Sequence, residues 1–264
     1  MEYHVSTAAM AAMTISLIAG VVIPLGLFLV LRFRYKCKIV PFFVGCGTFL
    51  VFAMVLESLL HRAVVAGSLG KVLTENIWLY GLYGALAAAT FEEVGRYISM
   101  RILHARKVTD AGTGLMFGAG HGGFECFYIL VVGMCSNLMV AAMVNSGRLE
   151  EITKMLPADQ QEAFLVQIDV LASTGAAMFL VGVLERLIAV TGHMVMSVLV
   201  WRSVSAKGQG FCFLLAFAMH FAMDFAAVMI SRFFGVAVTE LVIAIIVLAF
   251  LLLTVKLCQN KSAE

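Results

Sequence analysis

The stretch ATFEEVGRYISM, from Ala89 to Met100, places Glu92, Glu93 and Arg96 in a segment that is otherwise apolar enough to lie in lipid. Charged side chains are costly in the hydrocarbon core of a bilayer, and those found there usually face the interior of a helix bundle or a water-filled cavity. The stretch therefore predicts a membrane helix whose polar face lines the inside of a bundle.

The composition of the whole chain agrees with a membrane protein. Of the 264 residues, 62% are hydrophobic and 13% are charged, and the mean hydropathy is +1.01. Soluble domains contain about 45–50% apolar and about 25% charged residues. The net charge of +2 is small and the basic residues are scattered over loop positions, so no nucleic acid partner is expected. The six cysteines form no CxxC pair, and we expect neither a disulfide framework nor a cysteine metal site.

Seven apolar runs are long enough to cross the hydrocarbon core, for which a helix needs about 20 residues. They cover approximately residues 10–31, 39–61, 77–100, 111–144, 165–201, 211–230 and 236–257. The predicted fold is an all-α polytopic membrane helix bundle of about seven (7–8) transmembrane helices, in a single integral-membrane domain over residues 1–264. The fourth and fifth runs exceed one straight crossing, so they are expected to tilt, to break at glycines or to begin as an interfacial piece. The glycines of AGTGLMFGAGHGG favour a break in the fourth run.

Lysine and arginine residues give the predicted orientation. Eleven fall in the loops that are inside if the N-terminus is outside, and five fall in the opposite loops. Cytoplasmic loops are enriched in these residues, so the bias predicts N-out, C-in. The longest loop, NSGRLEEITKMLPADQQEAF (residues 145–164), then lies outside and has room for a short amphipathic helix.

Polar residues in four of the predicted spans share one depth. Glu92 lies eight residues, His121 ten, His193 eight and His220 nine from the inner ends of their spans. At 1.5 Å per residue, these positions are all about 12–15 Å from the cytoplasmic boundary. Neighbouring helices run in opposite directions, so unrelated polar residues would be scattered in depth. The common layer predicts a single buried site.

Spacing along the helices places several of these polar groups on common helix faces, because residues four apart are neighbours on one side of a helix. The pairs are Glu92 and Arg96, His121 and Glu125, and His220 and Asp224. Each pair has a structural interpretation as an ion pair or hydrogen-bonded clamp between helices, and His193 could equally be structural. One buried polar cavity accounts for all of them at one depth more simply than separate clamps do.

Glu57 and His61 have the same four-residue spacing but lie at the outer end of the second run, beside Arg62. Their depth separates them from the common layer. We therefore interpret them as interfacial residues without a chemical role.

Imidazoles and carboxylates without cysteine suit a borderline cation such as Zn²⁺, with a reactive water at an open coordination position. A glutamate beside that water can act as general base in a hydrolysis. Neither GxSxG nor HExxH occurs, so a metal site would be assembled from separate helices. A transporter could use the same groups as a proton relay, although paired and similarly interrupted halves are not apparent.

The ordered motifs FEEVGR, FGAGHGGFE, ER with His193, and HFAMD resemble those of the YhfC-type intramembrane metalloproteases. These belong to the wider group of CAAX prenyl endopeptidases and bacteriocin-processing (CPBP) proteins. The resemblance covers about residues 77–230. It implies that Glu92 or Glu93 activates the hydrolytic water, and that His121 of an FxxxH motif shares this water or a metal.

The same resemblance matches His220 and Asp224 to an HxxxN/D motif that is implicated in metal binding or in stabilising the oxyanion. The EExxR motif here is one residue shorter than the EExxxR typical of CAAX proteases, so Arg96 points differently relative to Glu93. The relatives also include a non-proteolytic scaffold subunit of gamma-secretase, and the fold by itself does not establish catalysis.

Together these patterns predict an intramembrane metallopeptidase, a hydrolase that cuts a membrane-associated substrate near the cytoplasmic leaflet. The expected catalytic residues are Glu92, Glu93, His121 and Arg96, and the expected metal ligands are His121, His193, His220 and Asp224, with Zn²⁺ as cofactor. The expected substrate is a membrane protein or lipidated peptide, and the expected location is the membrane of a bacterial cell. A non-catalytic membrane scaffold and an ion- or proton-coupled transporter are the alternatives.

Overall fold

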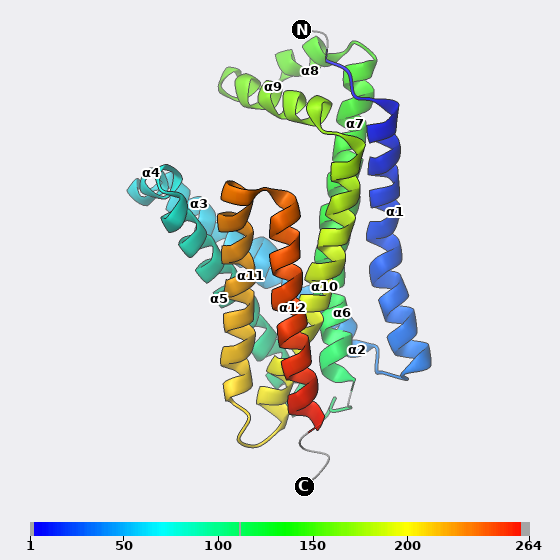
Figure 1. Cartoon of the computed structure of the whole chain (residues 1–264), viewed down its shortest axis with the longest axis vertical. Coiled ribbons are helices and arrows are strands. Elements are labelled where there is room, and N and C mark those ends of the chain that lie inside the picture. Colours follow the sequence, from blue (N-terminus) through cyan, green and yellow to red (C-terminus); the bar gives the residue numbers. More distant parts are fainter. Residues whose placement is uncertain (1–2, 111, 260–264) are drawn as a thin grey trace. The chain divides into compact units, whose positions relative to one another are not determined.

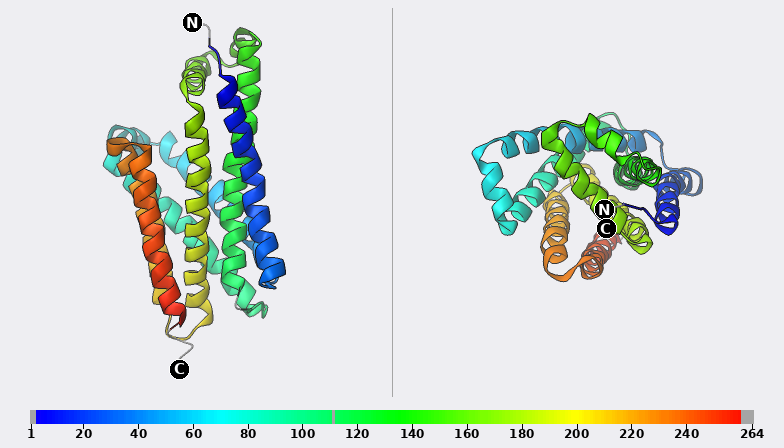
Figure 2. Two further views of the ribbon diagram at one scale, coloured as in Figure 1. Left: turned by 45° about the vertical axis from the view of Figure 1, so that its right-hand side comes forward. Right: turned by 90° about the horizontal axis from the view of Figure 1, so that it is seen from above.

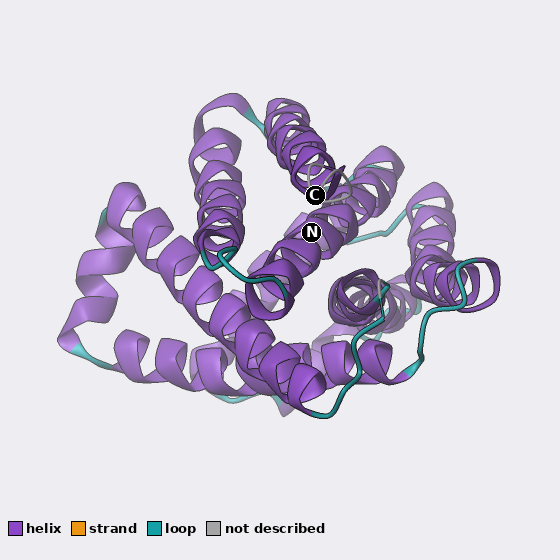
Figure 3. Cartoon of the chain, turned by 90° about the horizontal axis from the view of Figure 1, so that it is seen from below, coloured by secondary structure: helices purple, strands orange, loops and turns teal. Residues whose placement is uncertain are grey.

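The computed structural model describes residues 3–110 and 112–259, and all regular secondary structure in this part of the chain is helical (Figures 1 and 3). The elements, with π-helical stretches labelled η, are α1 (Thr7–Leu29), η1 (Val30–Arg34), α2 (Val40–Thr48), η2 (Phe49–Glu57), α3 (Ser58–Ala66), α4 (Ser68–Glu75), α5 (Ile77–Ala105), α6 (Thr113–Phe127), η3 (Tyr128–Val132), α7 (Gly133–Asn145), α8 (Leu149–Met155), α9 (Ala158–Ser173), α10 (Ala176–Ser205), α11 (Phe211–Phe234) and α12 (Val236–Gln259). The all-α prediction is confirmed.

Six helical stretches in the described residues are long and apolar enough to cross a membrane. They are Thr7–Arg34, Val40–Ala66, Thr113–Asn145, Ala176–Ser205, Phe211–Phe234 and Val236–Gln259, and they correspond to six of the seven predicted runs. The remaining run forms α5, whose 29 residues extend about 43 Å at 1.5 Å per residue. The chain is thus a polytopic helical membrane protein. The seventh crossing and the N-out, C-in orientation stay predictions.

The expected break in the fourth run is wrong, because α6 continues through its glycines without interruption and the irregular π-helical turn of η3 comes after them. The fifth run does begin with a separate piece. Residues 165–173 belong to α9, and α10 starts at Ala176 after Thr174, whose backbone is extended. The loop 145–164 contains α8 and the start of α9. Residue 111, where the fourth predicted run begins, and Lys261 of the charge count lie outside the described residues.

The chain divides into two compact units, residues 1–23 with 126–187 and residues 24–125 with 188–264. In the first unit, the Asn145 side chain at the end of α7 makes two hydrogen bonds to the backbone of Val5, each 2.9 Å long. Ala9, Met13 and Ala141 are buried in its core. Cys37, Cys46, Cys135 and Cys258 are free thiols.

In the second unit, α11 packs along both α5 and α12, and η2 packs along α5. Figure 2 shows α11 and α12 as a hairpin of two antiparallel helices in orange and red. Phe117, Met100, Leu199 and Met219 are buried in the core of this unit, and they come from four different helices. This packing holds the polar faces of α5, α6, α10 and α11 within one unit.

Three glycines of α6 allow close approach of α10. Gly114, Gly118 and Gly122 recur every four residues and so lie on one helix face. A Cβ atom at Gly118 would lie 2.6 Å from the Cα of Met194, and one at Gly122 would lie 2.8 Å from the Cβ of His193. Small residues at this spacing let the backbones of membrane helices approach closely. The glycines that were expected to break the helix therefore determine its packing distance.

We expect Gly118→Ala to destabilise the protein by about 1–3 kcal/mol, the usual cost of overpacking, since the new methyl group would meet backbone that cannot move aside. Gly47→Ala in α2 is the matched control, because no atom lies within 4 Å of a Cβ at that position. Thermal unfolding of the purified protein in detergent measures both. Equal melting temperatures for the two variants would contradict this account of helix packing.

Candidate metal centre

Acidic, basic and imidazole side chains from four helices of the second unit gather in one buried cluster. The contributing residues are Glu92, Glu93 and Arg96 of α5, His121 and Glu125 of α6, His193 of α10, and His220 and Asp224 of α11. Glu93, Arg96 and His121 have no exposed surface. The side chains of the predicted layer thus lie together, while the roles assigned to them stay predictions.

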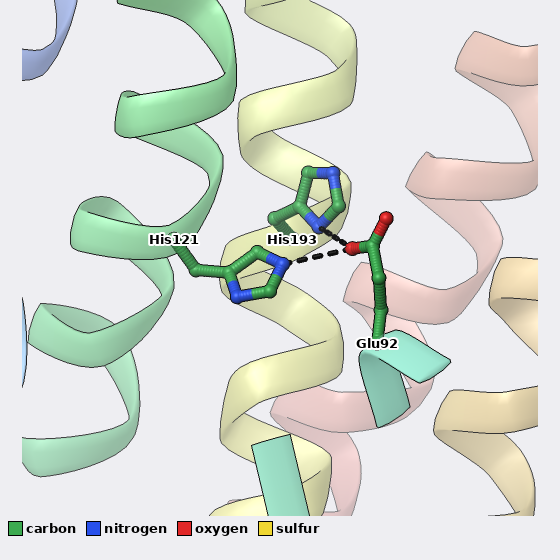
Figure 4. Close-up of side chains that lie close together, drawn as sticks. All are labelled: Glu92, His121 and His193. Atoms are coloured by element: carbon green, nitrogen blue, oxygen red, sulfur yellow. Dashed lines mark hydrogen bonds and ion pairs between the residues drawn. The ribbon is translucent and has the colours of Figure 1, made fainter. Parts of the chain in front are cut away.

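Three of these residues form a compact group of donor atoms. One ligand atom each of Glu92, His121 and His193 lies within 4.8 Å of the others. Glu92 Oε2 is 2.8 Å from His121 Nε2 and 3.9 Å from His193 Nδ1, and Figure 4 shows both imidazoles directed at this carboxylate. Two imidazoles and one carboxylate are a ligand set found in catalytic zinc sites, where the fourth position stays open for water or substrate. The donor set therefore fits a metal ion.

The charges of the cluster also favour a cation. Among the described residues of the cluster, four carboxylates (Glu92, Glu93, Glu125 and Asp224) accompany a single guanidinium, that of Arg96. Burying carboxylates without a compensating charge is strongly unfavourable. A divalent cation beside Glu92 would balance much of the excess, as bound cations commonly do in acidic sites.

Glu93 links Arg96 to His220. Its Oε1 lies 2.5 Å from Arg96 Nη1 and accepts a hydrogen bond from His220 Nδ1 at 2.8 Å. Arg96 Nη2 lies 3.0 Å from His193 Nδ1 and 3.9 Å from Glu92 Oε2. In this EExxR sequence, Arg96 therefore reaches both glutamates and one of the histidines.

His220 and Asp224, which the sequence predicts as metal ligands, border the compact donor group. His220 Nε2 is 3.4 Å from Asp224 Oδ2 and 3.9 Å from Glu92 Oε1. In the described part of the chain, the group that could hold a metal comprises Glu92, His121 and His193. Metal binding by His220 and Asp224 stays a prediction, and their observed contacts place His220 between Glu93 and Asp224.

Glu125 belongs to the cluster, although it was assigned neither a catalytic nor a metal-binding role from the sequence. Its Oε2 lies 2.6 Å from Nε2 of His193, on the ring edge away from Glu92. The signal was present in the sequence, because Glu125 follows His121 by four residues and so shares its helix face. Glu185 and Arg186, which precede His193 on α10, contact each other at 2.5 Å and belong to the other unit.

Residues 19–247 match the family model described as YhfC intramembrane metalloprotease. The match covers most of the chain, so the protein belongs to this family, whose name implies a metal ion. Over 247 residues it is 32% identical to the protein of Bacillus subtilis (strain 168) described as "Uncharacterized membrane protein YhfC", with 92% of this chain and 93% of that protein covered. No solved structure matches. The protein is therefore an integral membrane protein of the YhfC family.

We expect the purified protein to bind about one divalent cation per chain, and His121→Ala to lower the affinity at least tenfold because it removes one of three donors. Elemental analysis after dialysis against a weak chelator measures the bound metal. His104→Ala is the control, since this exposed imidazole of α5 lies outside the cluster. Undiminished metal content in His121→Ala would rule out the proposed donor group.

Glu125→Gln should weaken metal binding by about 10–100-fold, the usual effect of removing a carboxylate that orients a histidine ligand. Titration with a competing chelator measures the affinity. Asp159→Asn in α9 is a control that removes a carboxylate from the other unit. If Glu125→Gln and Asp159→Asn both bind metal like the wild type, Glu125 does not position His193.

Proposed function

We propose that the protein is an intramembrane metallopeptidase that hydrolyses a peptide bond of a membrane-associated substrate. The single observation that carries this proposal is the buried convergence of Glu92, His121 and His193, with His220 and Glu93 directly beside them. Membership of the YhfC family supports it. The substrate class we propose is a membrane protein or a lipidated peptide.

Glu92, His121 and His193 would hold the metal, and Zn²⁺ suits this mixture of nitrogen and oxygen donors. A bound Zn²⁺ supplies Lewis acidity, which polarises a carbonyl group and makes a water molecule more acidic. Glu92 contributes Oε2 to the donor group, while its Oε1 faces His220 at 3.9 Å. The carboxylate can therefore serve the metal and the neighbouring imidazole with different oxygens.

His220 is the residue best placed to move a proton. Its Nδ1 proton is held by Glu93, which leaves Nε2 directed toward Glu92 and Asp224. In the proposed reaction, Nε2 takes a proton from the attacking water and later gives it to the amide nitrogen as the carbon–nitrogen bond breaks. The water oxygen and its second proton become part of the new carboxyl group, and this proton then passes to the released amine, so one water is consumed and the products are a carboxylate and an ammonium group.

Arg96 and Glu93 act as positioning residues in this proposal. Arg96 contacts Glu93 on the same helix through its guanidinium, which would fix the carboxylate that contacts His220. Hydrogen bonds between charged partners are the stronger class, particularly in a buried setting. The pair would keep the imidazole in a single orientation and tautomer while a substrate enters.

The test uses purified protein in lipid nanodiscs, loaded with Zn²⁺ and incubated with a library of synthetic transmembrane peptides. Mass spectrometry identifies new amino termini. We expect cleavage by the wild type and a loss of about 10²–10⁴-fold in His220→Ala, the usual contribution of a general acid or base. His104→Ala, which changes an imidazole outside the cluster, should cleave at the wild-type rate.

Metal content is measured on the same samples. A variant that loses cleavage because it no longer binds metal is thereby distinguished from one that loses cleavage because it lacks the proton carrier. Full cleavage by Glu92→Ala, His121→Ala and His220→Ala would overturn the proposed site. A folded, metal-loaded wild type that cleaves no membrane peptide would favour the non-catalytic scaffold instead.

A further inference from the structure

A second polar cluster of the same unit is formed by Glu57 at the end of η2, His61 of α3 and Tyr83 of α5. His61 Nδ1 is 2.9 Å from the Tyr83 hydroxyl, and His61 Nε2 is 3.1 Å from Glu57 Oε1. The His61 and Tyr83 rings meet edge to face, with centroids 5.4 Å apart. Both ring nitrogens of this histidine are thus engaged by polar groups.

Glu57 connects this cluster to the metal centre. Glu57 ends η2, which packs along α5, the helix that carries Glu92 and Tyr83, and α11 with Asp224 packs along the same helix. The side chains of His61 and Asp224 are each 39% exposed, that of Glu57 is 12% exposed and that of Glu92 is 9% exposed. Polar groups therefore continue from the surface of the second unit to its buried donor atoms.

The buried centre needs water for two reasons. Glu93 Oε2, Arg96 Nε and His121 Nδ1 have no hydrogen-bond partner among the described residues, and buried polar atoms that the protein leaves unpaired are normally satisfied by ordered water. The proposed hydrolysis also consumes one water for each bond cut. In a helix bundle surrounded by lipid, water reaches a buried site only where polar side chains line its way.

Glu57 is the last residue of the π-helical stretch η2, a conformation that is frequent at functional sites. Its side chain is 12% exposed. Leu56 and Leu59, which flank Glu57 in the sequence, are exposed apolar residues suited to lipid. Glu57 is therefore a largely buried carboxylate between exposed apolar residues. A residue that only lies at the membrane interface would not need to be buried in this way.

We propose that Asp224, Glu57, His61 and Tyr83 line the route by which water reaches the metal centre. That this water is used for peptide hydrolysis rests on the proposed function. The route itself is independent of that function. Its carboxylates would also guide a hydrated cation toward Glu92, because acidic clefts concentrate cations.

Accessibility to a small, charged thiol reagent tests the route in lipid nanodiscs, where both membrane faces are open. His61→Cys and Leu59→Cys are compared in a protein whose six native cysteines are replaced by alanine. Leu59 is the matched control, since it is two residues away at nearly the same depth and is 55% exposed. Thiolates react and need water to ionise, so we expect Cys at position 61 to react at least about tenfold faster.

Equal reaction rates at the two positions would overturn the route. This outcome is independent of whether the protein cleaves peptides, so it is distinct from a failure of the proposed function.

A second measurement uses the native cysteines and does not depend on the cysteine-free protein folding. Release of bound Co²⁺ or Zn²⁺ to an external chelator is timed for the wild type, Glu57→Leu and His61→Leu. We expect about tenfold slower release from both variants, with metal content at equilibrium unchanged. Release at the wild-type rate from both would show that ions and water enter elsewhere.

Discussion

The structure depends on one constraint, which is that charged and imidazole side chains inside a membrane helix bundle must satisfy one another. Glu92, Glu93 and Arg96 are costly on any single helix, and the cost falls only when partners from other helices meet them. His121, His193 and His220 provide these partners from α6, α10 and α11. The geometry of a candidate metal centre is therefore also the condition under which α5 can lie among the other helices.

This convergence in turn depends on the absence of side chains in α6. Gly118 and Gly122 let the backbone of α10 approach until the His193 ring lies beside the His121 ring, with centroids 5.1 Å apart. A methyl group at Gly122 would meet the Cβ of His193 at 2.8 Å, and one at Gly118 would meet the His193 carbonyl oxygen at 3.0 Å. Packing and chemistry thus share the same residues, as is common where membrane helices build a polar site.

Hydropathy and periodicity were enough to predict the helices. The common depth of Glu92, His121, His193 and His220 was also predictable, because depth follows from counting residues along each helix. The partners within the layer could not be predicted in this way. That His220 contacts Glu93, and that Glu125 contacts His193, depends on how each helix is rotated about its axis and on side-chain rotamers. The start of α10 was missed for another reason, since residues 165–173 are apolar enough to extend the run but belong to α9.

Arg96 gives Glu93 an electrostatic role in the proposed metal centre, although Glu93 is not part of the donor group. The guanidinium lies 3.9 Å from Glu92 Oε2 and 3.0 Å from His193 Nδ1. By itself it would repel a cation held by these two residues. Glu93, 2.5 Å away, cancels this charge, so a cation in the donor group experiences the negative charge of Glu92. In the proposed centre, the second glutamate of the EExxR motif would therefore set the charge balance through the arginine. Its contact with His220 would link this balance to the proposed proton carrier.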